Sequence, residues 1–370
     1  MSRAGWRGTV RAARRAAPAL LAGALAVLAA GCQRQPRLVP AAADSALVGS
    51  RDSLEARVRL IRQAWDDPER GAEAARLTAG LLLQDLRVRV ATEPLGAWDQ
   101  RARDLLDSLD VGAEVAGVPC AMVVNLFSRG DPSAGSWPWA YWCGTSGITA
   151  QEVEGRGASL VAVSARGLFG DPPVPPGPPG IAALFTQRSG RGQQPLLLAW
   201  RVAGGRLDLA QTLGPDSLGV VGTGAFESEG DSAVVLATRT WRYTPRFDEC
   251  ATCPHVMRQH RFLWGAQGFH SVAESVVPSP YVTFVQLVQA LAAGDRDGAQ
   301  ALLASPDVLD AAMQSGWGES RGSWRVAPGS GVGNEMVFYR GAAEAWKVHF
   351  ERRGDGWVVE SFEPTTRALQ

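Results

Sequence analysis

Four cysteines and two histidines are the residues of this sequence whose types and spacing suggest chemistry. Cys250 and Cys253 form a Cys-x-x-Cys motif. Such a motif acts as a redox pair where the first cysteine begins a helix, but both flanking segments here have the composition of strands. Haem attachment needs histidine directly after the second cysteine, whereas Pro254 separates Cys253 from His255.

A zinc site is a third interpretation of this motif. Cys250, Cys253, His255 and His260 are all zinc-ligand types, but they lie close together, and zinc ligands usually come as two separated pairs. We therefore predict no metal site here and expect Cys250 and Cys253 to form a disulfide at the tip of a hairpin. A pairing of Arg246 with Met257 would share the centre of that motif.

Cys120 and Cys143 are predicted to form a second disulfide. Residues 119–127 and 137–143 have the pattern of strands, and a turn-rich segment separates them. In a hairpin centred near residues 131–132 the two cysteines lie opposite one another. Directly opposed residues of an antiparallel pair come within disulfide range.

The N-terminus has the pattern of an export signal. Residues 1–15 carry five arginines and no acidic residue, and residues 16–30 are apolar. This run has the length of a cleaved signal rather than of a membrane-spanning helix.

The signal ends at Leu28-Ala-Ala-Gly-Cys32, which resembles the lipobox of bacterial lipoproteins. The resemblance implies cleavage after residue 31, lipidation of Cys32, and anchoring to the cell envelope on its periplasmic or outer face. An ordinary signal cut near Ala30 and a retained membrane anchor are the alternatives. Export to an oxidising compartment fits an even number of further cysteines, which can pair as disulfides.

Composition restricts the function classes. The chain has 37 basic and 37 acidic residues, and loss of the five signal arginines leaves a net charge of about −5, which offers no general attraction for nucleic acid. The chain lacks a phosphate-binding loop, a dinucleotide fingerprint and a His-Glu-x-x-His motif. We therefore predict no catalytic residues and no cofactor.

We predict a multidomain α+β fold, with N-terminal helices plus hairpins, a central antiparallel β meander, and C-terminal helices on a curved antiparallel sheet. The chain has 370 residues, which is more than a single hydrophobic core usually contains. The predicted segments are a signal peptide at 1–31, a flexible tether at 32–50, an α+β domain at 51–170, a Pro-rich linker at 171–180, a β domain at 181–275 and an α+β domain at 280–365.

Periodicity predicts the elements within these domains. Three helices are expected within residues 53–109, and the third of them covers 98–109. Further helices are expected at 281–293, 299–303 and 307–314. Strands of the central domain are expected at 182–187, 196–202, 206–213, 218–226, 233–243, 256–264 and 270–274. Others are expected at 119–127, 137–143, 152–154, 159–164, 323–326, 335–340, 343–352 and 356–363.

The last domain resembles the nuclear transport factor/ketosteroid isomerase-like cone fold. The resemblance rests on a small-small-Gly-Asp break between helices, Ala292-Ala-Gly-Asp295, and on Gly356-Trp357 in a late strand. It implies an apolar pocket. The family's catalytic carboxylate and pocket tyrosines have no matching positions here, so the resemblance implies no activity.

Together these patterns predict a membrane-anchored envelope lipoprotein with a non-catalytic binding or scaffolding role. We expect two partners: the membrane, which the lipid on Cys32 would enter, and an envelope protein. The aromatic cluster Trp137, Trp139, Tyr141 and Trp142 is either a contact surface or core. One alternative is a binder of a small apolar ligand in the C-terminal domain; another is a metal-dependent enzyme with a Cys/His site near Cys250.

Overall fold

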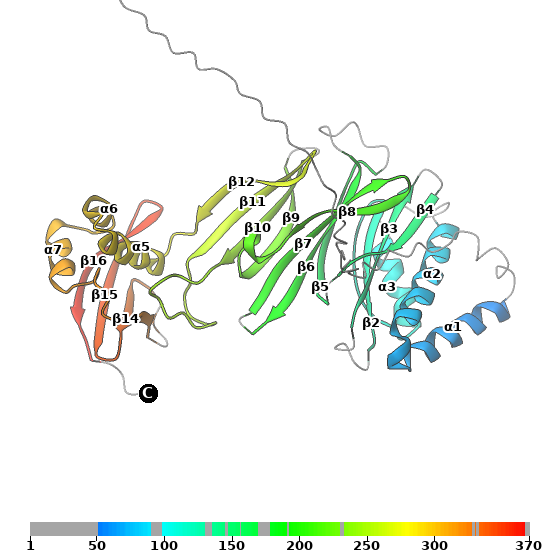
Figure 1. The fold of residues 1–370 in the computed structure, drawn as a ribbon, viewed down its shortest axis with the longest axis horizontal. Helices are drawn as coiled ribbons and strands as arrows, with labels where there is room; N and C mark the ends of the chain where they lie inside the picture. Colours follow the sequence, from blue (N-terminus) through cyan, green and yellow to red (C-terminus); the bar gives the residue numbers. More distant parts are fainter. Residues whose placement is uncertain are drawn as a thin grey trace, which may run out of the picture. The chain divides into compact units, whose positions relative to one another are not determined.

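A computed structural model describes most of the chain after residue 50 (Figure 1). The described residues are 51–89, 98–129, 135–144, 147–155, 157–168, 178–190, 192–229, 233–327, 330 and 333–366. The proposed lipidation site Cys32, the tether and most of the Pro-rich segment lie outside them. Over the described residues the fold is mixed α and β, with seven α-helices and four antiparallel four-stranded sheets.

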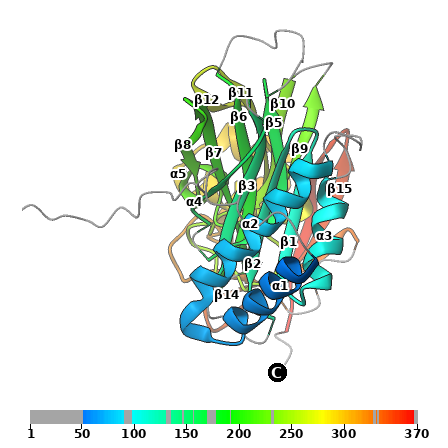
Figure 2. The ribbon, with the colours of Figure 1, turned by 90° about the vertical axis from the view of Figure 1, so that its right-hand side faces the viewer.

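Three helices pack on the first sheet, which we call sheet A. They pack on one of its faces (Figure 2) through a core that includes Leu82, Trp98 and Tyr141. The predicted helices are confirmed, and β1 is an additional strand. The elements are α1 (Arg51–Trp65), the short 3-10 helix η1 (Pro68–Arg70), α2 (Gly71–Arg89), α3 (Trp98–Ser108), β1 (Gly112–Val118), β2 (Ala121–Phe127), β3 (Trp137–Gly144) and β4 (Gly147–Glu152), with strand order β1-β2-β3-β4.

The aromatic cluster of β3 is core. Trp139, Tyr141 and Trp142 are at most 1% exposed, and Trp137 is partly buried against the helical core. Trp139 and Tyr141 face the helices, while Trp142 faces the opposite side of the sheet. The contact-surface interpretation was therefore wrong, because both faces of β3 are covered.

Two further sheets, B and C, complete the β region. The strand bounds agree closely with the predicted meander, except that a short helix, α4, replaces the predicted start of the strand at 218. Sheet B consists of β5 (Ser159–Arg166), β6 (Gly180–Ser189), β7 (Gly192–Ala203) and β8 (Arg206–Leu213); α4 (Pro215–Leu218) follows; sheet C consists of β9 (Val221–Glu229), β10 (Ala233–Trp241), β11 (Met257–Gly265) and β12 (Gly268–Val276), in the order β12-β11-β10-β9.

The Pro-rich segment connects two neighbouring strands of sheet B. β5 precedes it, β6 follows it, and the two strands pair from Ser159 with Thr186 to Arg166 with Gly180. Residues from both sides of the predicted boundary at 171–180 thus belong to one sheet.

The three sheets are stacked on shared cores. The face of sheet A away from the helices packs on one face of sheet B, where Trp142 and Phe185 belong to the same core. The other face of sheet B packs on sheet C through Leu184, Leu236 and Phe262. β6 therefore runs as a nearly continuous apolar strand, because both of its faces are buried.

Two glutamine side chains join the edge strands of successive sheets. Gln151 of β4 donates through Nε2 to the carbonyl of Leu207 in β8 (2.7 Å) and accepts from its amide (3.0 Å). Gln211 of β8 makes the same two bonds with Phe269 of β12, at 2.8 and 2.7 Å. Each side chain satisfies an edge backbone that the ladder leaves unpaired.

We expect replacement of Gln151 by leucine to lower the free energy of unfolding by about 2 kcal/mol, because it leaves a buried amide and carbonyl of Leu207 unpaired. Gln151 is 1% exposed and Leu207 is 2% exposed. Urea unfolding followed by circular dichroism measures the change. Gln211→Leu is the matched control and should cost less, since Gln211 is only half-buried. A larger loss for Gln211→Leu would contradict this expectation.

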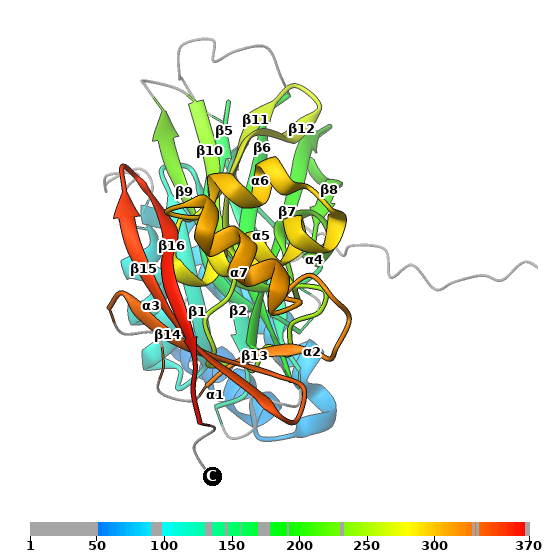
Figure 3. The ribbon, with the colours of Figure 1, turned by 90° about the vertical axis from the view of Figure 1, so that its left-hand side faces the viewer.

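The C-terminal part contains three helices and sheet D (Figure 3). Helix α5 is capped at both ends: Ser279 Oγ accepts from the amide of Val282, and Gly294 ends the helix with a left-handed φ of 73°. The elements are α5 (Pro280–Ala293), α6 (Arg296–Ala301), α7 (Pro306–Gln314), β13 (Trp324–Val326), β14 (Glu335–Arg340), β15 (Glu344–Arg353) and β16 (Gly356–Pro364), with strand order β13-β14-β15-β16.

Aromatic side chains fill the space between these helices and sheet D. Phe284 of α5 stacks on Phe338 at 3.7 Å between ring centroids, and Trp317 and Trp324 pack edge-on against Phe284. All four are at most 1% exposed. These four side chains therefore form a packed aromatic core between the helices and sheet D.

Candidate functional site

The candidate site is the junction loop, residues 242–256, which joins β10 to β11 and contains Cys250 and Cys253. The predicted pairing of Arg246 with Met257 was wrong, because Met257 pairs with Trp241. The strands separate after Trp241, and Arg246 has a left-handed φ of 70°. The Cys-x-x-Cys motif thus lies in a long loop rather than at the tip of a tight hairpin.

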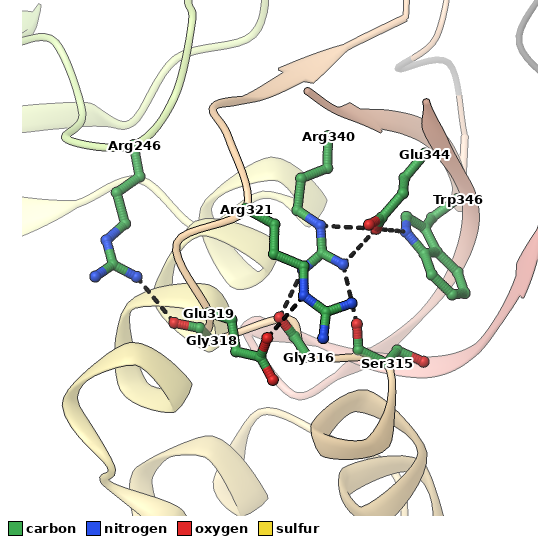
Figure 4. A network of polar contacts seen from close by, with 9 residues as sticks. All are labelled: Arg246, Ser315, Gly316, Gly318, Glu319, Arg321, Arg340, Glu344 and Trp346. Carbon is green, nitrogen blue, oxygen red and sulfur yellow. Dashed lines mark hydrogen bonds and ion pairs between the residues drawn. The ribbon is translucent and has the colours of Figure 1, made fainter. Parts of the chain in front are cut away.

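The loop leaves sheet C because its backbone bonds to the C-terminal part. The Trp324 amide donates to the carbonyl of Arg246 (2.8 Å), and the Asp248 amide donates to the carbonyl of Trp324 (2.7 Å). Phe247 thereby forms an isolated parallel bridge with Trp324 of β13. Arg246 Nη1 adds a bond to the carbonyl of Gly318 (3.0 Å; Figure 4).

Phe247 anchors this contact. Its side chain is 8% exposed and belongs to the aromatic core of the C-terminal part. The ring packs edge-on against Tyr281 and Phe284, with centroids 5.9 and 6.3 Å away. A loop between two strands of sheet C therefore contributes an aromatic side chain to a different core.

Glu249 is a buried carboxylate beside this anchor. Its side chain is 2% exposed. Oε1 accepts from the hydroxyl of Tyr281 (2.6 Å), and Oε2 accepts from the amide of Thr244 (3.0 Å). Desolvation acts to raise the pKa of Glu249, but the nearby His255 and the hydrogen bonds from Tyr281 and Thr244 outweigh it and place the pKa below its usual range.

Tyr281 shows the opposite effect. Burial, the hydrogen bond to Glu249 and the charge of that carboxylate all raise the pKa of the Tyr281 phenol. At neutral pH the phenol is therefore protonated and donates to an ionised Glu249, which is a charge-assisted bond.

His255 closes the cluster from the other end of the loop. Its ring stacks on Trp241 with centroids 3.5 Å apart, and its side chain is 6% exposed. Nδ1 lies 3.9 Å from Glu249 Oε2, which is beyond hydrogen-bond length. Neither ring nitrogen has a hydrogen-bond partner among the described residues.

We expect Glu249→Gln to lower the free energy of unfolding at neutral pH by about 1–2 kcal/mol, because the Tyr281 and Thr244 donors lose a charged acceptor. The folded-state pKa lies below the usual 4.5, so the carboxylate stabilises the fold above that value and its contribution is lost as the pH falls through the folded pKa.

The difference between Glu249→Gln and the parent chain should therefore shrink on acidification. Urea unfolding at neutral pH and at about pH 3 measures it. Glu274→Gln is the control, because that carboxylate is 45% exposed and its contribution should be small. A difference that is the same at both pH values would contradict the assignment to the Glu249 charge.

The cysteines pair as predicted. Cys120 and Cys143, and Cys250 and Cys253, each have Cα atoms 5.1 Å apart and form disulfides. The β2–β3 register pairs Ala121 with Trp142, which is the predicted hairpin alignment, and the amide of Cys143 donates to the carbonyl of Cys120.

The proposed zinc ligands do not meet. The Cys250–Cys253 disulfide uses both thiols, and His260 lies in β11 with Nε2 3.4 Å from Glu274 Oε1. Over the described residues, no group of three or more His, Cys, Asp or Glu side chains could hold a metal ion. His349, in β15, lies 3.6 Å from Glu335.

A buried arginine organises the loop that the junction contacts (Figure 4). Arg340 is 1% exposed and donates to the carbonyls of Gly316 (2.6 Å) and Ser315 (2.9 Å) and to Glu344 Oε2 (2.8 Å from Nε). Its guanidinium also lies 4.9 Å from the ring centroid of Trp324. Arg340 thus holds the backbone at Ser315 and Gly316 and contacts the tryptophan that pairs with the junction loop.

The sequence pattern gives no sign of Phe247, Glu249 or Arg340 as site residues. A single buried glutamate or arginine has no periodic signature, so nothing local marks them.

Within the described ranges, no helix has both the length and the hydropathy needed to cross a bilayer. No protein-family model matches this chain, and a search of curated proteins gives no significant match.

Proposed function

We propose that this chain is a bacterial envelope lipoprotein, anchored through a lipid on Cys32, with a non-catalytic binding or scaffolding role. One observation carries the proposal. The chain has five cysteines, and the four in its described part form two disulfides. Cys32 is the fifth, and it stands where the lipobox resemblance places the acylated residue. The two disulfides also suit an oxidising compartment outside the cytoplasm.

The layered architecture supports a scaffolding role. Central strands of sheets A and B are buried on both faces, and glutamine bridges join the sheet edges. The junction loop adds hydrogen bonds and an aromatic anchor between the β region and the C-terminal part. Such cross-links would oppose local separation of the sheets and of the junction loop, which is what a scaffolding role requires.

We also propose a multidomain organisation in which the C-terminal part, residues 280–365, is a cone-like domain of helices on a curved sheet. Its own aromatic core supports this division. A β-bulge between His349 and Phe350 in the β15–β16 pair supports the curvature, because bulges bend a strand.

Mass spectrometry of the detergent-extracted protein, before and after reduction, tests the proposal. We expect a chain that begins at Cys32, carries acyl groups and gains four hydrogens on reduction. The control is Cys32→Ala, which should remain in the aqueous phase of a detergent partition. An unacylated chain, or one that carries a stoichiometric metal or small molecule, would contradict the proposal.

A further inference from the structure

The two disulfides differ in their access to solvent. Cys120 is 4% exposed and Cys143 is 8% exposed, and both belong to the core between the helices and sheet A. Cys250, Ala251 and Thr252 are exposed, and Cys253 is half-buried. Thiol–disulfide exchange needs an attacking thiolate to reach a sulfur in line with the disulfide bond, so access decides which disulfide reacts.

We propose that Cys250–Cys253 is a site of thiol–disulfide exchange with a protein dithiol of the envelope, and that its reduction releases the junction loop from the C-terminal part. The inference rests on the proposed function only for the location of this partner. An exposed disulfide in a loop is a typical labile or regulatory one, whereas a buried disulfide is structural.

The chemistry is a two-electron exchange. A thiolate of the partner attacks Sγ of the exposed Cys250, which forms a mixed disulfide and breaks the bond to Cys253. The Cys253 thiolate takes up a proton. The partner's second thiol then attacks the sulfur of the partner's first cysteine in the mixed disulfide, which frees Cys250 as a thiol. The chain gains two hydrogens, and the partner dithiol becomes a disulfide.

The position of the disulfide couples this exchange to the junction. Cys250 directly follows Glu249, the acceptor of Tyr281, and Cys253 precedes His255 by two residues. The disulfide and the bond from the Cys253 amide to the Cys250 carbonyl turn the chain back on itself. That turn brings Glu249 and His255 to 3.9 Å from one another.

Reduction removes this closure. Without the disulfide, the released loop can adopt more conformations. It therefore loses more chain entropy when Glu249 bonds to Tyr281 and Phe247 enters the aromatic core. The contacts that should loosen are the backbone bonds of Arg246 and Asp248 with Trp324 and the bond from Tyr281 to Glu249. The cores of sheets A and B contain none of these residues.

Selective reduction is the first test. The full acylated chain is treated with a monothiol and then, separately, with a thioredoxin-type protein dithiol, and free thiols are alkylated and located by peptide mass spectrometry. We expect Cys250 and Cys253 to be alkylated at least 10-fold faster than Cys120 and Cys143, which are the internal control. Equal rates, or faster reaction of Cys120–Cys143, would overturn the proposal.

Hydrogen exchange is the second test and measures the coupling. After selective reduction we expect the amides of Asp248 and Trp324 to exchange at least 10-fold faster, with no change in β2. The variant Cys250→Ser/Cys253→Ser should give the same pattern, and Phe247→Ala should give it in the oxidised chain. Unchanged exchange at Asp248, or faster exchange that includes β2, would overturn the release of the loop.

The two proposals fail separately. The mass of the same sample reports acylation of Cys32, so an unacylated chain contradicts the proposed function without affecting the exchange rates. An acylated chain whose Cys250–Cys253 bond resists both reductants contradicts only the exchange site.

Discussion

Replacing Cys120 and Cys143 by alanine is expected to lower the free energy of unfolding by about 3 kcal/mol. The disulfide spans a sequence separation of 23, so its loss frees a long loop in the unfolded chain. Both residues are buried. The disulfide links the two strands of the β2–β3 hairpin beside the hydrogen bond from the Cys143 amide to the Cys120 carbonyl. Urea unfolding of the oxidised chain, followed by circular dichroism, measures the change.

The second disulfide supplies the matched control. Cys250 and Cys253 are separated by only three positions, so the same chain-entropy argument gives a smaller loss of about 2 kcal/mol for Cys250→Ala/Cys253→Ala. If this variant were the less stable of the two, the length of the closed loop would not be what decides how much each disulfide stabilises the fold.

A further variant separates the disulfide from the backbone. Cys120 has a left-handed φ of 63° in the turn between β1 and β2. Glycine adopts this conformation without steric cost, whereas the Cβ of alanine makes it unfavourable. Cys120→Gly/Cys143→Ala should therefore recover up to about 1 kcal/mol relative to the double alanine variant.

Replacement of Glu344 by alanine is the second large expected effect, a loss of about 3–5 kcal/mol in the C-terminal part. Arg340 is 1% exposed, and Glu344 is its carboxylate partner, itself 31% exposed. Removal of one partner leaves a buried charge without compensation, which costs far more than the pair contributes. Hydrogen exchange in β14 and α5 measures the local loss of stability.

The double variant Arg340→Met/Glu344→Leu is the control for this expectation. It removes the buried charge together with its partner, although the carbonyls of Ser315 and Gly316 lose their donor. It should therefore be more stable than Glu344→Ala. A double variant that is less stable than Glu344→Ala would show that the two carbonyl bonds, rather than the uncompensated charge, dominate.

Side-chain periodicity along the sequence predicted most elements of this protein. The strand predicted at 206–213 is β8, and the helix predicted at 281–293 is α5 with one more residue at its start. Caps such as Gly294 follow from local backbone conformation, which the residue type itself constrains. The Cys120–Cys143 disulfide was predicted because a hairpin brings opposed residues together at a register that sequence spacing defines.

Elements without a clear pattern were missed. β1 is Gly-Ala-Glu-Val-Ala-Gly-Val, in which two glycines and small side chains weaken the strand signal. The strand predicted at 152–154 is β4, which lies earlier, at Gly147–Glu152. Burial of β3 on both faces was one of two open alternatives, because its apolar side chains suit a core as well as a contact surface.

Only the tertiary structure decided which distant segments meet. The junction loop follows β10 in sequence, yet Phe247 enters the core of the C-terminal part and Arg246 and Asp248 bond to Trp324. Gln151 and Leu207, Glu249 and Tyr281, and Arg340 and the carbonyl of Gly316 are likewise distant in sequence. Local propensity acts over a few residues, whereas these contacts depend on how completed elements pack, and one buried polar side chain leaves no periodic trace in the sequence.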